Sequence, residues 1–292
     1  MRAATHLLII DPQNDFCDLP TSYLGIGPSG GLLKPALPVA GAHADMQRLA
    51  GFIDAAADRL DAISVTLDSH QHIDIAHPTF WQQADGSPVA PFTAITAEAL
   101  RSGAFRPRDV SALARAQAYV DELEARGRYT LMIWPVHCEI GSWGHNVHAD
   151  LLAAYNRWEE RRLRSVAKIG KGENPWTEHY SAIQAEVPLA DDVRTQMNRS
   201  LIETLNLAEL LLIAGEASSH CVRATTEHLA DYLPNACLSR VVLLTDCMSP
   251  VAGFEAQHLE FLADMRERGL QLATSAQALA LVAERCTRTI AP

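Results

Sequence analysis

Six short apolar runs separated by longer amphipathic segments constrain the fold of this chain more than any other feature. The apolar runs, which we expect to be strands, span residues 6–11, 60–68, 129–135, 165–170, 207–215 and 239–246. Five other segments place apolar residues three or four positions apart, as helices with one buried face do: 44–58, 110–127, 148–163, 219–233 and 254–269. This alternation predicts an α/β protein, a three-layer α/β/α sandwich with a mostly parallel six-stranded sheet.

The length of the chain and its hydrophobic content are consistent with one domain. Its 292 residues are 48% hydrophobic, which is enough to build a full core. We expect a single domain over residues 1–292, with loop insertions at about 19–38 and 84–128. The first insertion and residues 84–96 are rich in glycine and proline. Long loops of this kind are more often functional or oligomer-forming than idle.

The charge of the chain and its N-terminal sequence limit its partners and its location. A net charge of -11 and a pI near 5.5 argue against nucleic acid or an anionic membrane as the main partner. Only about five apolar residues precede Asp11, which is too few for a signal peptide, and no apolar run approaches the roughly 20 residues of a membrane helix. We therefore expect a cytoplasmic protein with reduced cysteines and a small-molecule partner.

Chemically active residues follow several of the predicted strands. Open parallel sheets bind ligands beyond the carboxyl ends of their strands, so these positions are candidate site residues. Asp11 directly follows the first apolar run, although an aspartate before a proline also forms turns. Lys171 follows the fourth run between two glycines, which allow close approach of the backbone. A solvent-exposed lysine in a loop is the alternative interpretation of Lys171.

Acidic and histidine side chains follow the second and third predicted strands. Asp68 and His70 are two positions apart, so in extended backbone their side chains project to the same side. His137, near the end of the third run, could complete an Asp/His/His set of ligands for zinc, iron or manganese. His72 and His77 are further candidates. A histidine-rich surface loop is the alternative interpretation.

Cys221 lies at the start of the helix expected after the fifth strand, where it could be a packing residue, a metal ligand or a nucleophile. The unpaired N–H groups and the positive dipole end of a helix N-terminus favour the thiolate and lower the pKa of such a thiol. The same N–H groups could hold a developing oxyanion. A carboxylate and a lysine nearby would supply the proton relay that a thiol nucleophile requires, so we favour the nucleophile.

Five segments resemble, in the same order, the nicotinamidase branch of the isochorismatase-like cysteine hydrolases. They are "LLIIDPQNDF", "TLDSHQHIDIAHPTFW", "WPVHCEIGSWG", "KGENPWTEHYSAI" and "AGEASSHCVRAT", and together they extend along nearly the whole chain. The resemblance implies the isochorismatase-like hydrolase fold. It also implies three catalytic roles: Asp11 as general acid and base, Lys171 as the catalytic lysine and Cys221 as the nucleophile.

The resemblance implies further roles around these three residues. Metal ligands are expected at Asp68, His70 and His137, with His77 as an additional histidine at the metal. Phe16 and Trp134 match the aromatic residues that sandwich a pyridine ring, although Trp134 could also be an ordinary core residue. A cis peptide bond is expected at Glu216–Ala217, with the N–H groups of Ala217 and Cys221 forming an oxyanion hole.

The function implied by the resemblance is that of a metal-assisted cysteine amidohydrolase. It would hydrolyse nicotinamide or a similar small aromatic amide through a Cys221 thioester. We expect a divalent metal ion, zinc first and iron or manganese next, and a homo-oligomer. The alternatives are an amidase of the same family acting on another small amide or ureido compound, and a non-catalytic protein that uses the cleft for binding.

Two features of the chain bear on its substrate. His137 follows His70 by 67 residues, a longer separation than in compact members of the family, and the segment 84–128 fills it with a loop and an additional helix. Glu216 stands where an apolar residue is expected in the cis-peptide turn. We expect both features to lie near the substrate entrance, where they would affect the choice of substrate more than the chemistry.

Overall fold

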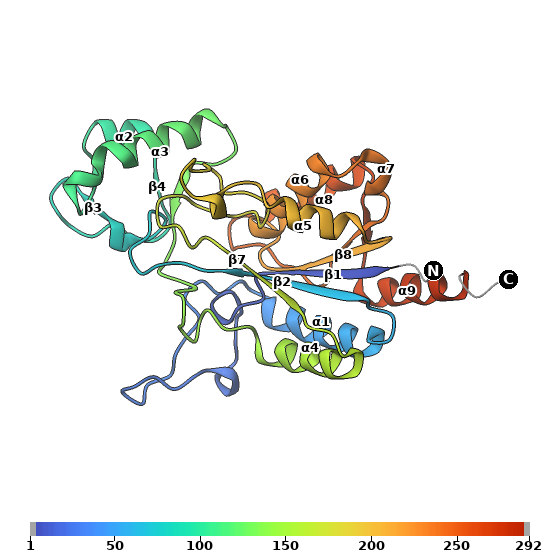
Figure 1. Cartoon of the computed structure of the whole chain (residues 1–292). Helices are drawn as coiled ribbons and strands as arrows, with labels where there is room; N and C mark the ends of the chain where they lie inside the picture. Colours follow the sequence, from blue (N-terminus) through green and yellow to red (C-terminus); the bar gives the residue numbers. More distant parts are fainter. Residues whose placement is uncertain (1–3, 289–292) are drawn as a thin grey trace.

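The computed structural model describes residues 4–288, which fold around a central sheet of six parallel strands (Figure 1). In spatial order these strands are β10 (Gln271–Ala273), β9 (Val241–Leu244), β8 (Leu210–Gly215), β1 (Thr5–Ile10), β2 (Ala62–Asp68) and β7 (Ala167–Lys171). Strands β1 and β8 are buried along their whole length, as expected for strands in the middle of a covered sheet, and the last four residues of β1 and all of β8 are apolar or glycine.

Helices cover both faces of this sheet and complete the expected three layers (Figure 1). One face carries α1 (Ala42–Ala56), α4 (Ala149–Arg162) and α9 (Ser275–Arg288). The other face carries α5 (Arg199–Asn206), α6 (Cys221–Tyr232), the short α7 (Asn235–Leu238) and α8 (Glu255–Glu267). Each helix buries an apolar stripe against the sheet. The buried residues of the sheet and of the helices on both of its faces form one large hydrophobic core.

One predicted strand of the sheet is wrong. Residues 129–135 contain β6 (Leu131–Ile133), which pairs antiparallel with β4 (Thr93–Ile95) outside the main sheet. The position beside β2 is occupied by β7 instead, and the sixth strand is β10. Strand β10 has only three residues, of which one is buried, so its sequence carries little strand signal.

The insertion between β2 and β6 is more structured than the loop and single helix expected for residues 84–128. It contains β4, α2 (Ala97–Arg101), β5 (Phe105–Pro107) and α3 (Leu113–Ala125), and β5 pairs with β3 (Trp81–Gln83) just before it. These elements form a second hydrophobic cluster that includes Trp81, Tyr119 and Leu131. The insertion therefore folds around its own apolar centre, at the upper left in Figure 1.

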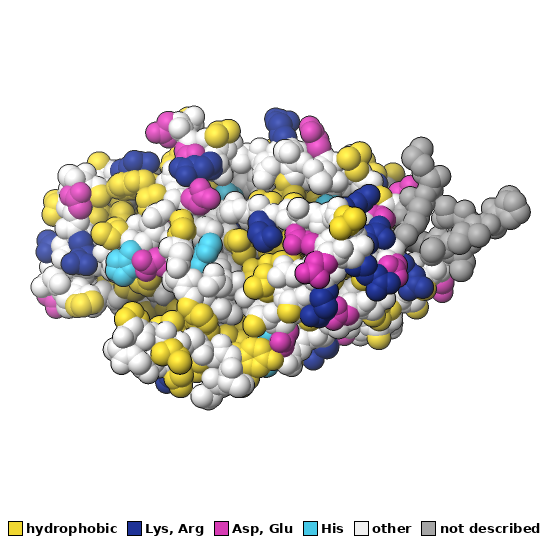
Figure 2. Space-filling model, turned by 60° about the horizontal axis from the view of Figure 1, so that its bottom comes forward, with side chains coloured by type: hydrophobic (Ala, Val, Ile, Leu, Met, Phe, Trp, Pro, Cys, Tyr) yellow, Lys and Arg dark blue, Asp and Glu magenta, His cyan; other side chains and the backbone are white. Residues whose placement is uncertain are grey.

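Charged side chains are unevenly distributed on the surface seen from the side of α1 and α4 (Figure 2). Charged side chains crowd these two helices, where Arg157 and Arg161 of α4 pair with Asp54 and Asp58. The loop 19–38, at the lower left, is mainly uncharged and exposes Ile26 and Leu32. Across residues 4–288, no helix combines the length and the apolar character needed to cross a membrane.

Candidate active site

Four neighbouring elements bring the predicted site residues to one edge of the sheet. Asp11 follows β1, Asp68 ends β2, Lys171 ends β7 and Cys221 begins α6 directly beyond β8. Because β8, β1, β2 and β7 are adjacent and parallel, their carboxyl ends meet, and Asp68 lies opposite Lys171 in the ladder. The Gln13 side chain joins the ends of β1 and β2, since its amide donates to the Asp68 carbonyl and accepts from the Asp68 N–H, both at 2.7 Å.

Lys171 is the centre of the buried charge network. Its Nζ lies 2.9 Å from Asp11 Oδ2, 2.9 Å from Asp68 Oδ1 and 3.6 Å from Cys221 Sγ. It also donates to the His179 carbonyl at 2.9 Å. Both carboxylates and the ammonium group are almost fully buried. The structure therefore brings Asp11, Lys171 and Cys221 together, with one cation between two carboxylates and a thiol.

Burial and neighbouring charges act in opposite directions on these groups. Burial raises the pKa of the Asp11 carboxyl, and the Lys171 charge opposes this only in part. Burial also disfavours the Asp68 carboxylate, but the charges of His70 and Lys171 outweigh it and hold its pKa well below the usual range. The pKa of Lys171 is raised because the two carboxylates outweigh its desolvation. Asp11 is thus the more basic carboxylate of the pair.

The expectation that the helix N-terminus lowers the pKa of Cys221 is wrong. Burial raises the pKa of this thiol well above its usual value, and the Lys171 charge offsets the effect only partly. Only 6% of Cys221 is exposed, so the thiolate would have little contact with water. At neutral pH the sulfur therefore holds its proton, and a base must remove it before it can act as a nucleophile.

The turn before Cys221 has the expected cis peptide bond at Glu216–Ala217. Backbone hydrogen bonds hold it from both sides, since the Glu216 N–H donates to the Ile10 carbonyl and the Ser218 N–H to the Ser249 carbonyl. The Glu216 carboxyl is fully buried and accepts from the Ser249 N–H at 3.1 Å. Burial and the Asp45 charge raise its pKa, so a neutral carboxyl fills this apolar position. It faces Ser249 and Asp45 rather than the substrate entrance where we expected it.

Three of the predicted histidines form a potential metal site. The ligand atoms of His70, His77 and His137 all lie within 4.8 Å of one another, and all three side chains are buried. Asp68 Oδ2 is 3.1 Å from His70 Nε2 and 3.4 Å from His137 Nε2. His72 lies outside this group, because its exposed ring pairs with Glu139 at 3.0 Å. Three imidazoles and one carboxylate form a donor set that suits a divalent metal ion such as zinc.

The surroundings of His70 and His77 act differently on their pKa values. Burial disfavours the charged form of His70, but the charges of Asp68 and Asp74 outweigh it and raise the pKa of His70 well above its usual value, so a metal ion would have to displace this proton. Burial lowers the pKa of His77 to about 2, which keeps its imidazole neutral. The Asp74 carboxylate lies 3.2 Å from His70 Nδ1, on the side of the ring away from Asp68. Metal-binding histidines commonly have a carboxylate at the second nitrogen, which fixes the ring orientation. The residue types present and their spacing therefore fit a divalent metal ion.

A small cavity adjoins the Cys221 sulfur. Its wall includes both predicted aromatic residues, Phe16 and Trp134, so the structure brings them to the site. The sequence did not indicate three other wall residues: Glu178, Tyr180 and His220. Glu178 and Tyr180 lie in the matching segment "KGENPWTEHYSAI", which could have identified them. The cavity measures about 30 Å³, so a ring-sized ligand enters only when some of these side chains move.

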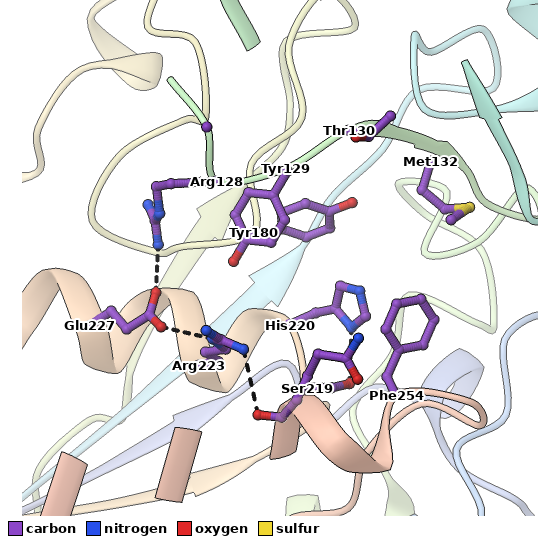
Figure 3. A pocket seen from close by; sticks show the side chains of 12 residues that line it. Arg128, Tyr129, Thr130, Met132, Tyr180, Ser219, His220, Arg223, Glu227 and Phe254 are labelled. Carbon is purple, nitrogen blue, oxygen red and sulfur yellow. Dashed lines mark hydrogen bonds and ion pairs between the residues drawn. The ribbon is translucent and has the colours of Figure 1, made fainter. Parts of the chain in front are cut away.

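A larger cavity of about 500 Å³ lies on the other side of Tyr180 and His220 (Figure 3). Residues 127–132, which lead from the insertion back to the main domain, form one side of it, and α6 forms another. Arg128 and Arg223 both bond to Glu227, at 2.8 and 2.7 Å, as the dashed lines in Figure 3 show. This cavity was not expected from the sequence.

A buried carboxyl group beside the larger cavity predicts a pH dependence of stability. Burial raises the pKa of Glu186 from about 4.5 to about 7, although Arg128, 3.6 Å away, lowers it. Between these two pKa values the Glu186 carboxyl is ionised in the unfolded chain but protonated in the folded chain. The free energy of unfolding therefore falls as the pH rises through this range. We expect Glu186→Gln to increase the free energy of unfolding by about 3 kcal/mol near pH 8 and much less near pH 4. Urea denaturation at both pH values measures this, and an equal effect at both would contradict it.

Comparison with known proteins identifies the fold. No family model and no curated protein match the chain in sequence. The yeast nicotinamidase is 19% identical, with 92% of this chain and 99% of that chain covered and a TM-score of 0.58. A nicotinamidase/pyrazinamidase of Acinetobacter baumanii is 18% identical, with 94% and 98% covered and a TM-score of 0.59. A pyrazinamidase of Pyrococcus horikoshii, solved in complex with zinc, is 18% identical, with 92% and 98% covered and a TM-score of 0.52. The chain therefore has the isochorismatase-like hydrolase fold of the nicotinamidases and pyrazinamidases.

Proposed function

We propose that the chain is a metal-assisted cysteine amidohydrolase that converts nicotinamide, or a similar small aromatic amide, to the acid and ammonia. The observation that carries this proposal is the contact of Lys171 with Asp11, Asp68 and Cys221 beside a buried three-histidine cluster. Solved structures with the same fold are named nicotinamidases and pyrazinamidases, which supports the same activity here.

The acylation step follows from the order of basicity in the site. Asp11, whose pKa is raised, removes the proton from the Cys221 thiol. The sulfur then attacks the carboxamide carbon, and the negative charge on the carbonyl oxygen is received by the N–H groups of Ala217 and Cys221. When the C–N bond breaks, Asp11 returns the proton to the nitrogen, which leaves as ammonia. Lys171 remains charged throughout and keeps two nearby carboxylates compatible with burial.

Deacylation uses the same carboxylate. Asp11 takes a proton from a water molecule as its oxygen adds to the thioester carbon, and the C–S bond breaks to give the carboxylic acid. The thiol recovers its proton from Asp11, which restores the starting state. Since the pKa of Asp11 lies above that of an ordinary carboxyl, this residue can both accept and return a proton during one turnover.

We propose that Asp68, His70, His77 and His137 hold a divalent metal ion, with zinc first and iron or manganese as alternatives. The zinc complex of the Pyrococcus horikoshii pyrazinamidase supports zinc. When bound, the ion supplies a Lewis acid beside the thiol and a partner for the ring nitrogen of a pyridine. Phe16 packs edge-on against His137 with ring centroids 5.4 Å apart, so a ring placed between Phe16 and Trp134 would lie next to these ligands.

His77 and His72 provide a matched pair for testing the metal site. We expect His77→Ala to weaken zinc binding at least about tenfold. Loss of a group that only supports a metal ligand already has an effect of about this size, and loss of a ligand should cost at least as much. His72→Ala removes an exposed histidine two positions from His70 and five from His77, and it should leave the zinc affinity unchanged. Competition with a zinc-binding dye measures both variants. Equal losses in the two would contradict the assignment of His77 as a ligand.

The direct test of the proposed function is the release of nicotinic acid and ammonia from nicotinamide by the purified, zinc-loaded protein. We expect equal amounts of the two products. A folded, zinc-loaded protein that releases neither would overturn nicotinamide as the substrate.

We further propose a cytoplasmic homo-oligomer in which residues 1–292 form a single hydrolase domain, the insertion 84–128 included.

A further inference from the structure

A neighbouring loop holds the turn that leads into the nucleophile. The turn comprises residues 215–221, which connect β8 to α6, and the loop comprises residues 245–251, directly after β9. Three hydrogen bonds join them through backbone groups or a serine hydroxyl: Gly215 N–H to the Cys247 carbonyl at 2.9 Å, Ser218 N–H to the Ser249 carbonyl at 2.9 Å and Val251 N–H to Ser219 Oγ at 3.1 Å. A fourth runs from the Ser249 N–H to Glu216 Oε2 at 3.1 Å. The carboxyl group of Glu216 is therefore part of the contact that fixes the turn.

The second oxygen of Glu216 links the turn to helix α1. Glu216 Oε1 is buried, and no hydrogen-bond donor lies within reach of it in residues 4–288. Because burial keeps this carboxyl neutral, one of its oxygens carries a proton and requires an acceptor instead. The Asp45 carboxylate is that acceptor, since the two side chains are hydrogen-bonded. Asp45 is held in turn by Arg48 of the same helix and by the Ser249 hydroxyl, which lies 2.6 Å from its Oδ2.

Two N–H groups of the turn are free to bind a ligand. Among the hydrogen bonds of residues 4–288, none uses the N–H of Ala217 or of Cys221. The N–H groups of Glu216 and Ser218, on either side of Ala217, are both bonded to backbone carbonyls. Buried backbone donors are normally paired, so two unused ones beside the thiol are available to a developing oxyanion. Their position depends on how the turn is held.

We propose that Glu216 is a positioning residue, which holds the Ala217 N–H where it receives the oxyanion formed when Cys221 attacks the amide. The inference rests on the proposed function, because this oxyanion arises only in that reaction. Glu216 lies outside the wall of the small cavity beside Cys221, so it acts through the turn and not on the substrate. Charge on the carbonyl oxygen develops in the transition state. Displacing the N–H groups therefore lowers kcat and leaves substrate binding nearly unchanged.

The test compares Glu216→Leu with Glu216→Gln in the zinc-loaded enzyme. Leucine fills the space but leaves the Ser249 N–H and the Asp45 carboxylate without this partner. We expect kcat for nicotinamide to fall about tenfold or more with little change in KM, because outright loss of one oxyanion donor costs about 10²–10³-fold. Glutamine can accept from the Ser249 N–H and donate to Asp45, so Glu216→Gln should retain most of the wild-type kcat.

A second readout uses ligands in place of turnover. The affinity of Glu216→Leu for nicotinaldehyde, whose adduct with the thiol places an oxygen at the oxyanion position, should fall by about the same factor as kcat. Its affinity for nicotinic acid should stay close to that of the wild type. If Glu216→Leu does not fold, Asp45→Asn weakens the same contact from the α1 side and should lower kcat with KM unchanged.

Asp61→Leu is the matched control. Asp61 also accepts from a backbone N–H, that of Thr5 at 3.0 Å, but it lies at the amino ends of β1 and β2. The variant should keep the wild-type kcat and KM. A Glu216→Leu enzyme with the wild-type kcat, or one that changes KM alone, would overturn the positioning role. If the wild type releases no product from nicotinamide, the proposed function fails, and equal nicotinaldehyde affinities of the wild type and Glu216→Leu would overturn the inference separately.

Discussion

We expect the replacement of Cys221 with alanine to remove the proposed hydrolysis of nicotinamide almost completely, with a loss of about 10⁴-fold or more in kcat. The reason is geometric, because Cys221 is the thiol that contacts Lys171 and lies in the cavity with Phe16 and Trp134. The remaining groups of the site can bind and polarise the amide, but they cannot form the acyl intermediate.

The matched control for this prediction is Cys237→Ala, which removes a partly exposed thiol on α7. It should retain the wild-type rate. Ammonia and nicotinic acid are measured together, and circular dichroism establishes that both variants fold. A Cys221→Ala enzyme that keeps more than about a tenth of the wild-type kcat would show that the thiol is not the nucleophile. Binding and polarisation of the amide by the remaining groups would give a much lower rate.

Replacing Lys171 with methionine has the largest expected effect on stability. The ammonium group lies 2.9 Å from both Asp11 and Asp68, and removing it leaves two carboxylates buried without their common cation. Breaking a buried ion pair from one side typically costs about 3–5 kcal/mol. We expect a loss of this size in the free energy of unfolding of the metal-free protein, measured by urea denaturation.

Lys168→Met is the control on the same strand. Lys168 is exposed, and its Nζ lies 5.2 Å from the centre of the Tyr155 ring, so its replacement should cost less than about 1 kcal/mol. Adding Asp11→Asn to Lys171→Met should recover part of the lost stability, because it removes one of the unpaired charges. Similar losses for Lys171→Met and Lys168→Met would show that the buried network does not depend on the lysine.

The sequence predicted those strands whose apolar sequence matches a buried position in the middle of the sheet. Strand β8 and the last four residues of β1 form apolar runs in the middle of the sheet, and both strands were expected. Strand β10 and helix α5 are short, and one of the three residues of β10 is polar, so they gave no comparable signal. Residues 129–135 have the composition of a sheet strand, but which strand they pair with depends on tertiary packing that composition does not encode.

The site was predictable to the extent that it follows from sheet topology. Asp11, Lys171 and Cys221 meet because they stand at the ends of adjacent parallel elements. His137 reaches the cluster although β6 is outside the sheet, since backbone hydrogen bonds join His70 to Cys138 and to Ile140 at 3.0 Å. The pKa of Cys221 could not be predicted, because it depends on how completely the folded chain removes the sulfur from water.

The most direct test of the central claim is the reaction of Cys221 with an aldehyde analogue of the amide. Nicotinaldehyde labelled with carbon-13 at its carbonyl should add to the thiol and form a thiohemiacetal, which moves the carbon signal from the carbonyl region to that of a saturated carbon. We expect this change with the wild-type protein and none with Cys221→Ala. An unchanged carbonyl signal in the presence of excess wild-type protein, or the same change with Cys221→Ala, would contradict the assignment of Cys221 as the nucleophile of an aromatic amidase.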